Sequence, residues 1–402
     1  MGLTIRTLGE DDYQAFSDVV AAAFLSDPDP SDAAFERPLY DLDRVHGVFD
    51  GSELIGSGAV LAREVTVPGA GPRPTAAITS VGVKPGHRRR GVLTKVMRAQ
   101  FDQMRDQGGE ALAVLWASEG SIYGRYGYGL AAQMTDLRLP RGAAFHPGVD
   151  VGEERVREVP RDEAMPLLRA VYDRVAPTRA GYLSRAEAHW DYHLADGEQH
   201  RDGLTKYRFA LHPRGYAVYR VKNSWGDRGP DNELNLRELT AEDDQAHAAL
   251  YRYLLDLDMV GELRYFGGSD DPVYHLLANP RLARRSNRDS LWVRLVDVDR
   301  ALVERGYLSD VDVVLDVTDD FCPWNAGRLR FTVRGGEADV RRVTDEPDVV
   351  LDVSALGAAF LGGTRLSTLA KAHFVRERTP GAVRALSHAL LGEAVPHCPE
   401  VF

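Results

Sequence analysis

The sequence has only two cysteines in 402 residues, Cys322 and Cys398, and they do not form a C-x-x-C pair. This scarcity excludes a disulfide framework and a cysteine-rich zinc site, and it is typical of proteins in a reducing compartment. The N-terminus is acidic and lacks the apolar core of a signal peptide, and the sixth position lacks the Ser or Thr that myristoylation at Gly2 requires. No run approaches the roughly 20 apolar residues of a membrane-spanning helix. We therefore expect a cytoplasmic protein with no membrane partner.

A surplus of positive charge is also missing. The chain holds 49 Lys and Arg against 60 Asp and Glu, so its formal net charge is −11. This balance opposes general nucleic-acid binding and favours cationic partners. GxSxG, HExxH and EF-hand patterns are absent as well, which leaves little support for hydrolase or metalloprotease chemistry, and no metal is expected.

A length of 402 residues exceeds what one hydrophobic core normally serves, so two or three domains are expected. The first 140 residues alternate helix and strand patterns, which predicts a mixed α/β unit. An amphipathic helix is expected to start at Asp11 or Asp12 as its cap, and a hairpin to turn at Asp50-Gly51. Residues 76–83 are expected to form a buried strand, and residues 112–117 another strand. The helix between them has an apolar stripe of Val92, Leu93, Val96, Met97, Phe101 and Met104.

Prolines and glycines between residues 140 and 152 indicate a linker, after which a second unit repeats the first loosely. It shows a helix around 164–172, a hairpin-like segment at 207–219, and a strand at 234–239 that leads into another helix. At that junction stands the acidic run Thr240-Ala-Glu-Asp-Asp244, which would repel a polyphosphate. We predict that this half does not bind a phosphate-bearing coenzyme.

From about residue 289 the pattern changes again. Strand-like runs at 311–317, 329–333 and 349–353 predict an antiparallel sheet, and helical patterns around 355–361 and 382–391 are expected to cover one face. The resulting division is 1–145, 146–288 and 289–402.

The most informative segment joins a predicted strand ending at Val81-Gly-Val83 to a helix beginning near Gly91. N–H groups at a helix start lack intrahelical partners and lie at the positive end of the helix dipole. Glycine lets a ligand approach the backbone, and Arg88, Arg89 and Arg90 concentrate cationic charge where a pyrophosphate would dock. A basic run alone is usually a solvated face, but strand, turn, glycine and helix together favour the phosphate site.

The residue pattern of this segment excludes two other kinds of phosphate site, the P-loop and the dinucleotide-binding loop. Gly86 and Gly91 have the P-loop spacing, but Val92-Leu93 stands where Lys-Ser or Lys-Thr is required. The G-x-G-x-x-G dinucleotide fingerprint is absent from the segment as well. Nucleoside triphosphate and nicotinamide chemistry therefore have no support.

Arg88-x-x-Gly91 after Val81-Gly-Val83 resembles the coenzyme-A pyrophosphate loop of the GNAT acetyltransferase superfamily. Leu93 stands where the superfamily usually has glycine or alanine, a departure that is typical of the enhanced intracellular survival (Eis) branch. The segment Ala117-Ser-Glu-Gly-Ser-Ile-Tyr-Gly-Arg-Tyr-Gly-Tyr-Gly129 is similar to that branch almost residue for residue. The resemblance spans nearly the whole chain, including Phe360-Leu-Gly-Gly-Thr364 and a terminal phenylalanine.

The resemblance implies an α/β fold with two tandem GNAT-like domains, the second degenerate, followed by a sterol-carrier-protein-like domain. It implies an N-acetyltransferase that uses acetyl-CoA to acetylate cationic amines, including aminoglycosides and possible protein lysines, in a homo-hexamer. The coenzyme-binding residues expected on this basis are Val81, Gly82, Val83, Arg88, Arg89, Arg90, Gly91, Val92, Leu93, Thr94, Ser118 and Glu119. Ser118 alone also fits a helix cap.

Acetyl transfer requires a polarised carbonyl and an acid for the leaving thiolate. A strand that splays near Val81–Val83 would aim a backbone N–H at the carbonyl oxygen. Tyr123 is the expected general acid, since Gly127-Tyr128 follows it as in the superfamily signature and a phenol stays protonated at neutral pH. Tyr126 and Tyr128 compete for this role.

The resemblance assigns the general base to the terminal carboxylate of Phe402. His397 and Glu400 are nearby rivals, and histidine is better matched to neutral pH. Asp27 and Glu400 are candidates for attracting a polyamine, although surface solvation explains either acid alone. Two non-catalytic alternatives stay open: an acetyl-CoA sensor, or a protein whose third domain binds an apolar ligand.

Overall fold

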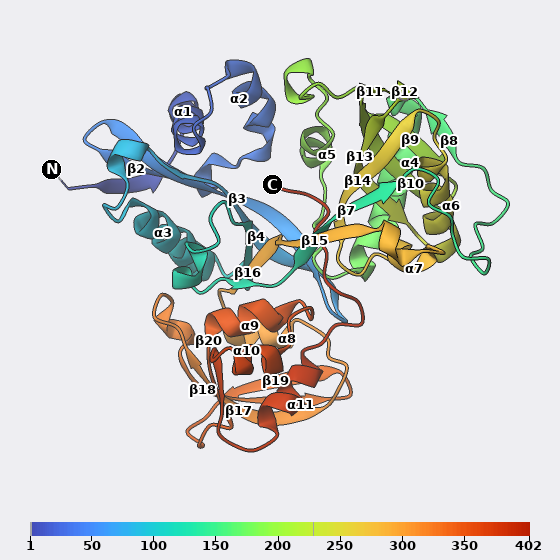
Figure 1. The fold of residues 1–402 in the computed structure, drawn as a ribbon. Helices are drawn as coiled ribbons and strands as arrows, with labels where there is room; N and C mark the ends of the chain where they lie inside the picture. The colour runs from blue at the N-terminus through green and yellow to red at the C-terminus, as the bar shows by residue number, and fades with distance from the viewer. Residues whose placement is uncertain (1, 228) are drawn as a thin grey trace.

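The first unit is built on a mixed seven-stranded sheet (Figure 1). The computed structural model describes residues 2–227 and 229–402. In spatial order the strands of this sheet are β1 (Thr4–Thr7), β2 (Val45–Asp50), β3 (Glu53–Val67), β4 (Gly71–Val83), β5 (Leu112–Trp116), β16 (Leu291–Leu295) and β6 (Gly129–Leu130). Its helices are α1 (Tyr13–Phe24), α2 (Pro30–Glu36) and α3 (Val92–Gln107).

Helices α1 and α3 cover opposite faces of this sheet. A Cβ on Gly56 of β3 would lie 2.4 Å from Val92 of α3, whereas one on Gly82 of β4 would lie 2.7 Å from Ala23 of α1. Gly56 and Gly82 belong to successive cross-strand pairs and so face opposite sides, where each lets a helix approach closely. The predicted apolar stripe of α3 is confirmed, with Val92, Val96, Met97, Phe101 and Met104 buried.

The expected cap of α1 is confirmed in its position but not in its hydrogen bond. Asp12 occupies the N-cap position, but its side chain makes no capping bond to the helix. Its carboxylate instead pairs with Arg6 at 2.6 Å and accepts the Gly9 N–H at 2.9 Å. The pairing with Arg6, on the neighbouring strand β1, takes the carboxylate away from the start of α1.

A second seven-stranded sheet carries the middle of the chain. In spatial order it consists of β15 (Arg284–Asp289), β7 (Gln133–Pro140), β14 (Val260–Gly268), β13 (Asn232–Ala241), β10 (Gly215–Lys222), β9 (Arg208–His212) and β8 (Arg157–Val159). The accompanying helices are α4 (Arg161–Val175), α5 (Glu187–His193), α6 (Asp244–Leu255) and α7 (Val273–Leu276), and β11 (Trp225–Gly226) pairs with β12 (Gly229–Pro230) as a separate ribbon.

The first and second sheets exchange strands, which the sequence pattern did not reveal. β7 lies within residues 1–145 but pairs with β14 and β15 of the second sheet. β16 lies beyond residue 288 but inserts between β5 and β6 of the first sheet. The edges of the sheets therefore do not coincide with the boundaries expected at residues 145 and 288, because strand pairing joins segments far apart in the chain.

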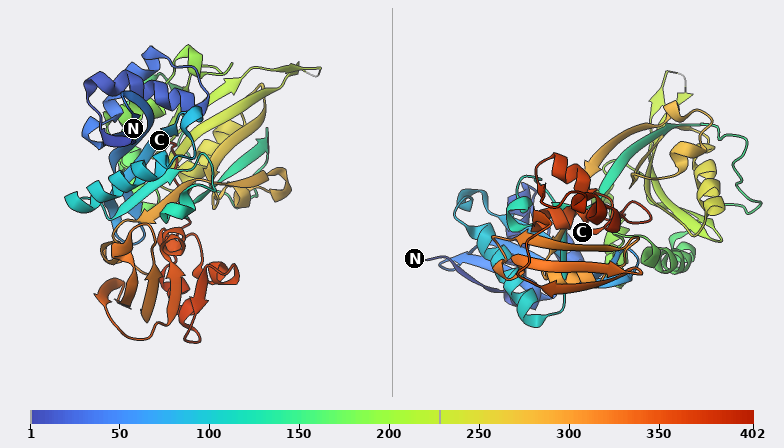
Figure 2. Two further views of the ribbon diagram at one scale, coloured as in Figure 1. Left: turned by 90° about the vertical axis from the view of Figure 1, so that its left-hand side faces the viewer. Right: turned by 90° about the horizontal axis from the view of Figure 1, so that it is seen from below.

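The third unit is set below the other two, in orange and red (Figure 2). Its five-stranded sheet has the order β19 (Glu337–Arg342), β18 (Gly327–Arg334), β17 (Val311–Thr318), β20 (Val349–Asp352) and β21 (Val375–Glu377). The expectation of a purely antiparallel sheet is wrong, because β20 returns beside β17 in parallel after the β17–β18–β19 meander. Its helices are α8 (Val298–Val303), α9 (Val353–Phe360), α10 (Leu366–Lys371) and α11 (Ala382–Ala389).

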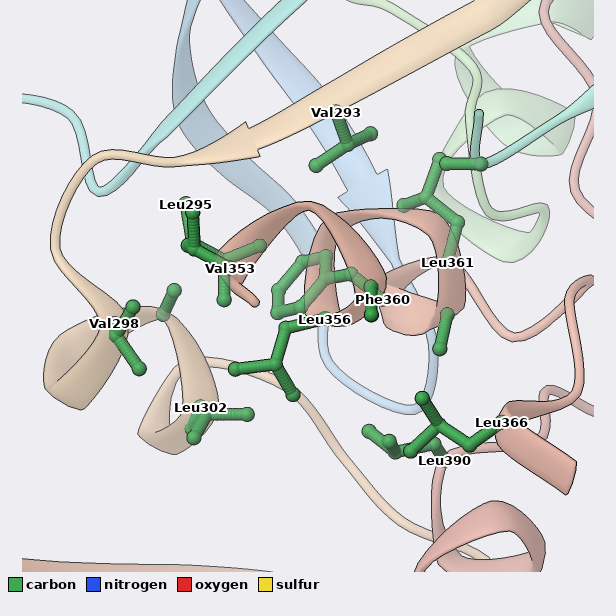
Figure 3. Packing of buried hydrophobic residues seen from close by; sticks show 14 of the residues in the cluster. Val293, Leu295, Val298, Leu302, Val353, Leu356, Phe360, Leu361, Leu366 and Leu390 are labelled. Atoms are coloured by element: carbon green, nitrogen blue, oxygen red, sulfur yellow. The ribbon is translucent and has the colours of Figure 1, made fainter. Parts of the chain in front are cut away.

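Helix α9 joins the first and third units through one apolar core (Figure 3). Leu356 and Phe360 of α9 pack in the same cluster as Val293 and Leu295 of β16. A Cβ on Gly357 would lie 2.3 Å from the carbonyl oxygen of Val293, so helix and strand are in close contact. The described residues contain no helix with both the length and the apolar character to cross a membrane.

Candidate active site

The site starts where strand β4 leaves its parallel neighbour. β4 and β5 pair from Thr75 with Leu112 to Ile78 with Leu115, and the ladder stops there. On the other side, the β3 register slips between Ser57 and Ala59, so two residues of β4 oppose one of β3. Ser80 adopts φ +51°, a left-handed conformation that is uncommon for a residue with a side chain. The splay expected near Val81–Val83 is therefore present as a bulge followed by a parted strand.

A cavity of about 540 Å³ opens beside the parted strand. It contains nearly all the residues expected to bind coenzyme: Val81, Gly82, Val83, Arg88, Arg89, Gly91, Val92, Leu93, Thr94, Ser118 and Glu119. Arg90 is the exception. Its guanidinium turns away to Asp50 at 2.9 Å and to the His87 ring at 2.8 Å.

The start of α3 forms the electropositive wall of this cavity. Gly91 has φ +79° at the N-cap and offers no side-chain cap to the first turn. Val92, Leu93 and Thr94 follow it at the cavity wall, at the end of the helix where backbone N–H groups lack intrahelical acceptors. Arg88 also donates to the Ala23 carbonyl at 3.1 Å, which ties the loop to α1. This wall suits a pyrophosphate group.

Tyr123 lines the same cavity and is only 5% exposed. It begins a 3-10 turn, Tyr123–Tyr126, that follows β5. Burial raises the pKa of its phenol to about 12, against a weaker opposing effect of Ser118. The group therefore stays protonated over the whole neutral range and is available as an acid.

The two rival tyrosines differ from Tyr123 in their surroundings. Tyr126 also lines the cavity, but its hydroxyl lies 3.2 Å from the Thr94 hydroxyl, which links the turn to α3. Tyr128 is buried in the apolar cluster beneath the turn, and burial raises its pKa well above the ordinary value. Of the three, Tyr128 is thus the one that does not reach the cavity wall.

A smaller cavity of about 200 Å³ lies beside the bulge. Phe24 borders both cavities, and adjacent residues of β4 divide between them, Ser80 in the smaller and Val81 in the larger. The remaining walls of the smaller cavity come from Val20, Glu36, Leu39, Tyr40, Leu61, Arg63, Thr79, His189, Tyr192, Glu400, Val401 and Phe402. The chain end, marked C in Figure 1, thus reaches a cavity between the first and second units.

Comparison with known proteins agrees with this arrangement. Family models described as "Acetyltransferase (GNAT) domain" match residues 4–131 and 181–295, and one described as "Sterol carrier protein domain" matches residues 298–399. "N-acetyltransferase Eis" of Mycobacterium tuberculosis is 35% identical, with 98% of each chain covered. The crystal structure of Eis1 from Mycobacterium abscessus superimposes with a TM-score of 0.88 at 34% identity, covering 99% of this chain and 100% of that one.

The chain belongs to the Eis family of GNAT acetyltransferases. An uncharacterized N-acetyltransferase of Streptomyces avermitilis is 40% identical over the full length of both chains. The resemblance that the motifs indicated is thereby confirmed, as is the expected fold of two GNAT domains followed by a sterol-carrier-like domain. The protein is an N-acetyltransferase.

In this Eis-family enzyme the two rivals of Phe402 for the role of base, His397 and Glu400, both have lowered pKa values. His397 is buried outside the smaller cavity, and burial lowers its pKa to about 3. Glu400 lines the cavity but binds Arg63 at 2.5 Å and Arg185 at 3.0 Å. Burial opposes ionisation of Glu400, yet Arg185 and Arg63 lower its pKa to about 2. A carboxylate held in this way is a poor proton acceptor.

The two expected substrate acids lie in different places. Asp27 is exposed after α1 and borders neither cavity. Glu400 borders the smaller cavity, but its charge is compensated by the two arginines. Glu36, a half-buried acid on the same cavity wall, was not among the residues expected from the sequence. Burial and repulsion by Asp32 raise the pKa of Glu36, so its ionised form gains from an added cation.

Sequence reasoning also missed the arginines around Glu400. Arg63 is 337 residues away from Glu400 in the chain, and Arg185 is 215 residues away. Neither belongs to a short motif, so only the packing of the first unit, the second unit and the tail brings them together. No local signal in the sequence identifies them.

Proposed function

We propose that the enzyme transfers an acetyl group from acetyl-CoA to a primary amine of a cationic substrate, by direct attack in a ternary complex. The observation that carries the proposal is the pair of cavities that meet at the β4 bulge. The larger has an electropositive helix start and a buried phenol, which suits a pyrophosphate and a thiolate. The smaller has acidic residues and the chain end, which suits an amine.

The residues of the larger cavity divide the chemical work. Acetyl-CoA, when bound, supplies the activated acetyl group. The start of α3 with Arg88 and Arg89 holds its phosphates, and the parted strand at Val81–Val83 offers N–H groups to the carbonyl oxygen. As a C–N bond forms and the C–S bond breaks, the Tyr123 hydroxyl donates its proton to the departing thiolate.

The smaller cavity prepares the acceptor. The amine loses one proton before it attacks, because only the neutral nitrogen has a lone pair, and a second proton leaves as the amide forms. The Phe402 carboxylate accepts the first proton, directly or through water, and the second proton restores the Tyr123 hydroxyl, so that one proton is released overall. Glu36 attracts the cationic substrate. Aminoglycosides, and lysine side chains of proteins, are the substrate classes that we propose. We also propose a homo-hexamer, as the family resemblance implies. Light scattering would test it by measuring the molar mass in solution.

The direct test is thiol release from acetyl-CoA with kanamycin or a lysine peptide as acceptor. We expect thiol release that depends on the amine, with acetylated product detected by mass spectrometry. Persistent silence over a broad panel of cationic amines, together with heat of binding on titration with acetyl-CoA, would favour the sensor alternative. The apolar-ligand alternative has weaker support, since Leu356, Phe360 and their neighbours fill the space around α9 (Figure 3).

A further inference from the structure

A buried network of charged and polar side chains connects the chain end to the second unit. It consists of Arg63 of β3, Arg185 before α5, His193 of α5, Glu238 of β13 and Glu400 of the tail, and we call these five residues the tail clamp. Arg185 and Glu238 are 0% and 1% exposed at the side chain, and Glu400 is 4% exposed. All three parts of the chain that surround the smaller cavity contribute to it.

Glu400 uses both carboxylate oxygens in the tail clamp. Oε1 accepts from Arg63 at 2.5 Å and Oε2 accepts from Arg185 Nε at 3.0 Å. Arg63 in turn donates to the Ser184 carbonyl at 2.6 Å, which joins β3 to the segment that carries Arg185. Because Phe402 is two residues beyond Glu400, the position of this carboxylate limits where the terminal residue lies.

The other side of Arg185 is fixed by the second unit. Its two terminal nitrogens donate to both oxygens of Glu238 at 3.2 and 2.8 Å, while its guanidinium lies 4.0 Å from the Tyr172 ring centroid. His193 lies with Nε2 2.6 Å from Glu238, and its Nδ1 is 3.0 Å from Arg237. The Tyr216 hydroxyl also donates to Glu238. Arg185 is thus held by a bidentate contact and a ring face, which leaves little freedom of orientation.

The tail clamp occupies the position in the second sheet that corresponds to the coenzyme opening in the first. β13 and β14 run parallel up to the pair Leu236 and Tyr265, and then part as β4 and β5 do. The β10 register slips at the same level, so Arg237 bulges like Ser80 in β4. Glu238 follows this bulge and meets Arg185, while Asp243 caps α6, the helix that corresponds to α3, through the Ala246 N–H. Side chains of the protein therefore fill the place where the first unit has its cavity.

Burying so many charges does not by itself explain the network. Desolvation of buried ion pairs costs about as much as their attraction returns, so their benefit is more often a defined geometry than stability. Here the defined geometry is that of the tail, since Glu400 is the network's only member from the last residues of the chain.

We propose that the second, GNAT-like unit serves the active site by clamping the tail: Arg185 and Glu238 act as positioning residues that hold Glu400, and through it the Phe402 carboxylate, at the smaller cavity. This inference rests on the proposed function, in which Phe402 is the base. It gives the second GNAT domain a task in acetyl transfer that does not require a second coenzyme.

The first arm of the test measures the tail itself, without catalysis. The intact chain is incubated with carboxypeptidase A, and the release of Phe402 is followed by mass spectrometry for wild type, R185Q and E400Q. We expect release to become about tenfold faster in both variants, since E400Q removes both ion pairs that hold the tail and R185Q removes one of the two. R169Q is the matched control, because Arg169 pairs with Glu187 on the surface of the same unit. Thermal unfolding of each variant verifies that it is folded.

The second arm measures kcat and KM in the same variants and in a chain that ends at Val401. We expect R185Q and E400Q to lower kcat by about tenfold to a hundredfold, with KM for acetyl-CoA unchanged, because a small displacement of a reacting group is costly. R185K should recover part of the loss, since it restores the charge. In the chain that ends at Val401, R185Q should change kcat by less than about twofold, because both changes act through the same group.

Wild-type rates of Phe402 release in folded R185Q and E400Q would overturn the clamp. A kcat loss from R185Q that persists in full in the chain ending at Val401 would overturn it too, because the arginine would then act elsewhere. The base is judged separately. Removal of Phe402 moves the terminal carboxylate back by one residue, to Val401. If kcat is then unchanged, a carboxylate at the position of Phe402 is not required as the base, while the release assay still reports on the clamp.

Discussion

At the residue scale, side chains of the same type differ in burial and in neighbouring charge, and the site depends on these differences. Tyr123, Tyr126 and Tyr128 lie within six residues, yet the first two line the larger cavity and the third packs beneath the turn. Glu36 and Glu400 share one cavity wall, yet among the described residues only Glu400 is paired with arginines. Side chains of one type thus acquire separate roles from their positions alone.

Replacing Tyr123 with phenylalanine tests the acid. We expect kcat to fall by about a hundredfold, the usual contribution of a positioned acid, with little change in KM for acetyl-CoA. Tyr126→Phe is the matched control. It removes a hydroxyl from the same cavity, one that contacts Thr94, and it should lower kcat much less. Steady-state kinetics of thiol release measure both variants. Equal losses of kcat in the two would show that Tyr123 is not the general acid.

Glu36→Gln tests the attraction of a cationic acceptor. KM for kanamycin should rise about threefold to tenfold, because a partly buried charge pair contributes on the order of 1 kcal/mol, while KM for acetyl-CoA stays constant. Asp27→Asn is the control, because Asp27 is exposed and outside both cavities. A larger effect at Asp27 than at Glu36 would contradict this assignment.

At the scale of elements, the proposed coenzyme site consists of a strand that parts from its neighbour, a loop and the start of a helix. The bulge at Ser80 comes after the last pair between β4 and β5, and α3 begins at Gly91 with its first turn against the cavity. The same elements recur in the second sheet, where Glu238 follows the bulge and Asp243 caps α6. The two sheets thus share a backbone arrangement but differ in function, because the side chains that follow the bulge and those at the start of the helix differ.

The arginine run of the loop divides into residues that face the cavity and one that does not. R88Q and R89Q should each raise KM for acetyl-CoA about tenfold, since a hydrogen bond to a charged group contributes roughly 1.5–3 kcal/mol. R90Q is the matched control and should change KM by less than about twofold, because Arg90 pairs with Asp50 at a partly exposed site. Titration calorimetry with acetyl-CoA checks the ranking, and equal losses for all three would show that only total charge matters.

At the scale of the whole molecule, the three units are joined by strand exchange, by a shared apolar core and by the tail. β7 and β16 cross between the first two sheets, and α9 packs against β16. The last residues then return from the third unit to lie between the first and second (Figure 1). Cutting the chain at any one boundary would therefore break contacts in two units.

Acid should destabilise the assembled molecule because of groups buried between its units. Burial lowers the pKa of His193 to about 4 and that of His397 to about 3, both from 6.5, so the unfolded chain binds these protons more readily. Stability is therefore full above pH 6.5 and falls as the pH drops, by on the order of 1–2 kcal/mol per histidine between pH 7 and pH 5. Chemical denaturation at pH 7, 6 and 5 measures the slope.

Glu400 extends this loss to lower pH. Arg185 and Arg63 overcome the effect of burial and lower its pKa from 4.5 to about 2, so its contribution is present above pH 4.5 and is lost as the pH falls toward 2. E400Q should flatten the pH dependence of unfolding in this lower window only. An unchanged profile below pH 4.5 in that variant would contradict the ionised, paired state of Glu400.

Several elements follow local rules and can be predicted from the residues alone: the apolar stripe of α3, the strands on either side of it, the glycine and arginines of the loop, and the turn at Tyr123. These follow from side-chain periodicity and short motifs, which act within about fifteen residues. Other features depend on the packing of distant segments: β7 and β16 exchange sheets, β20 runs parallel to β17, Arg90 turns to Asp50, and Arg63 and Arg185 meet Glu400. Those pairings join residues up to 337 positions apart, where the deciding quantity is which surfaces pack together, and no local pattern encodes it.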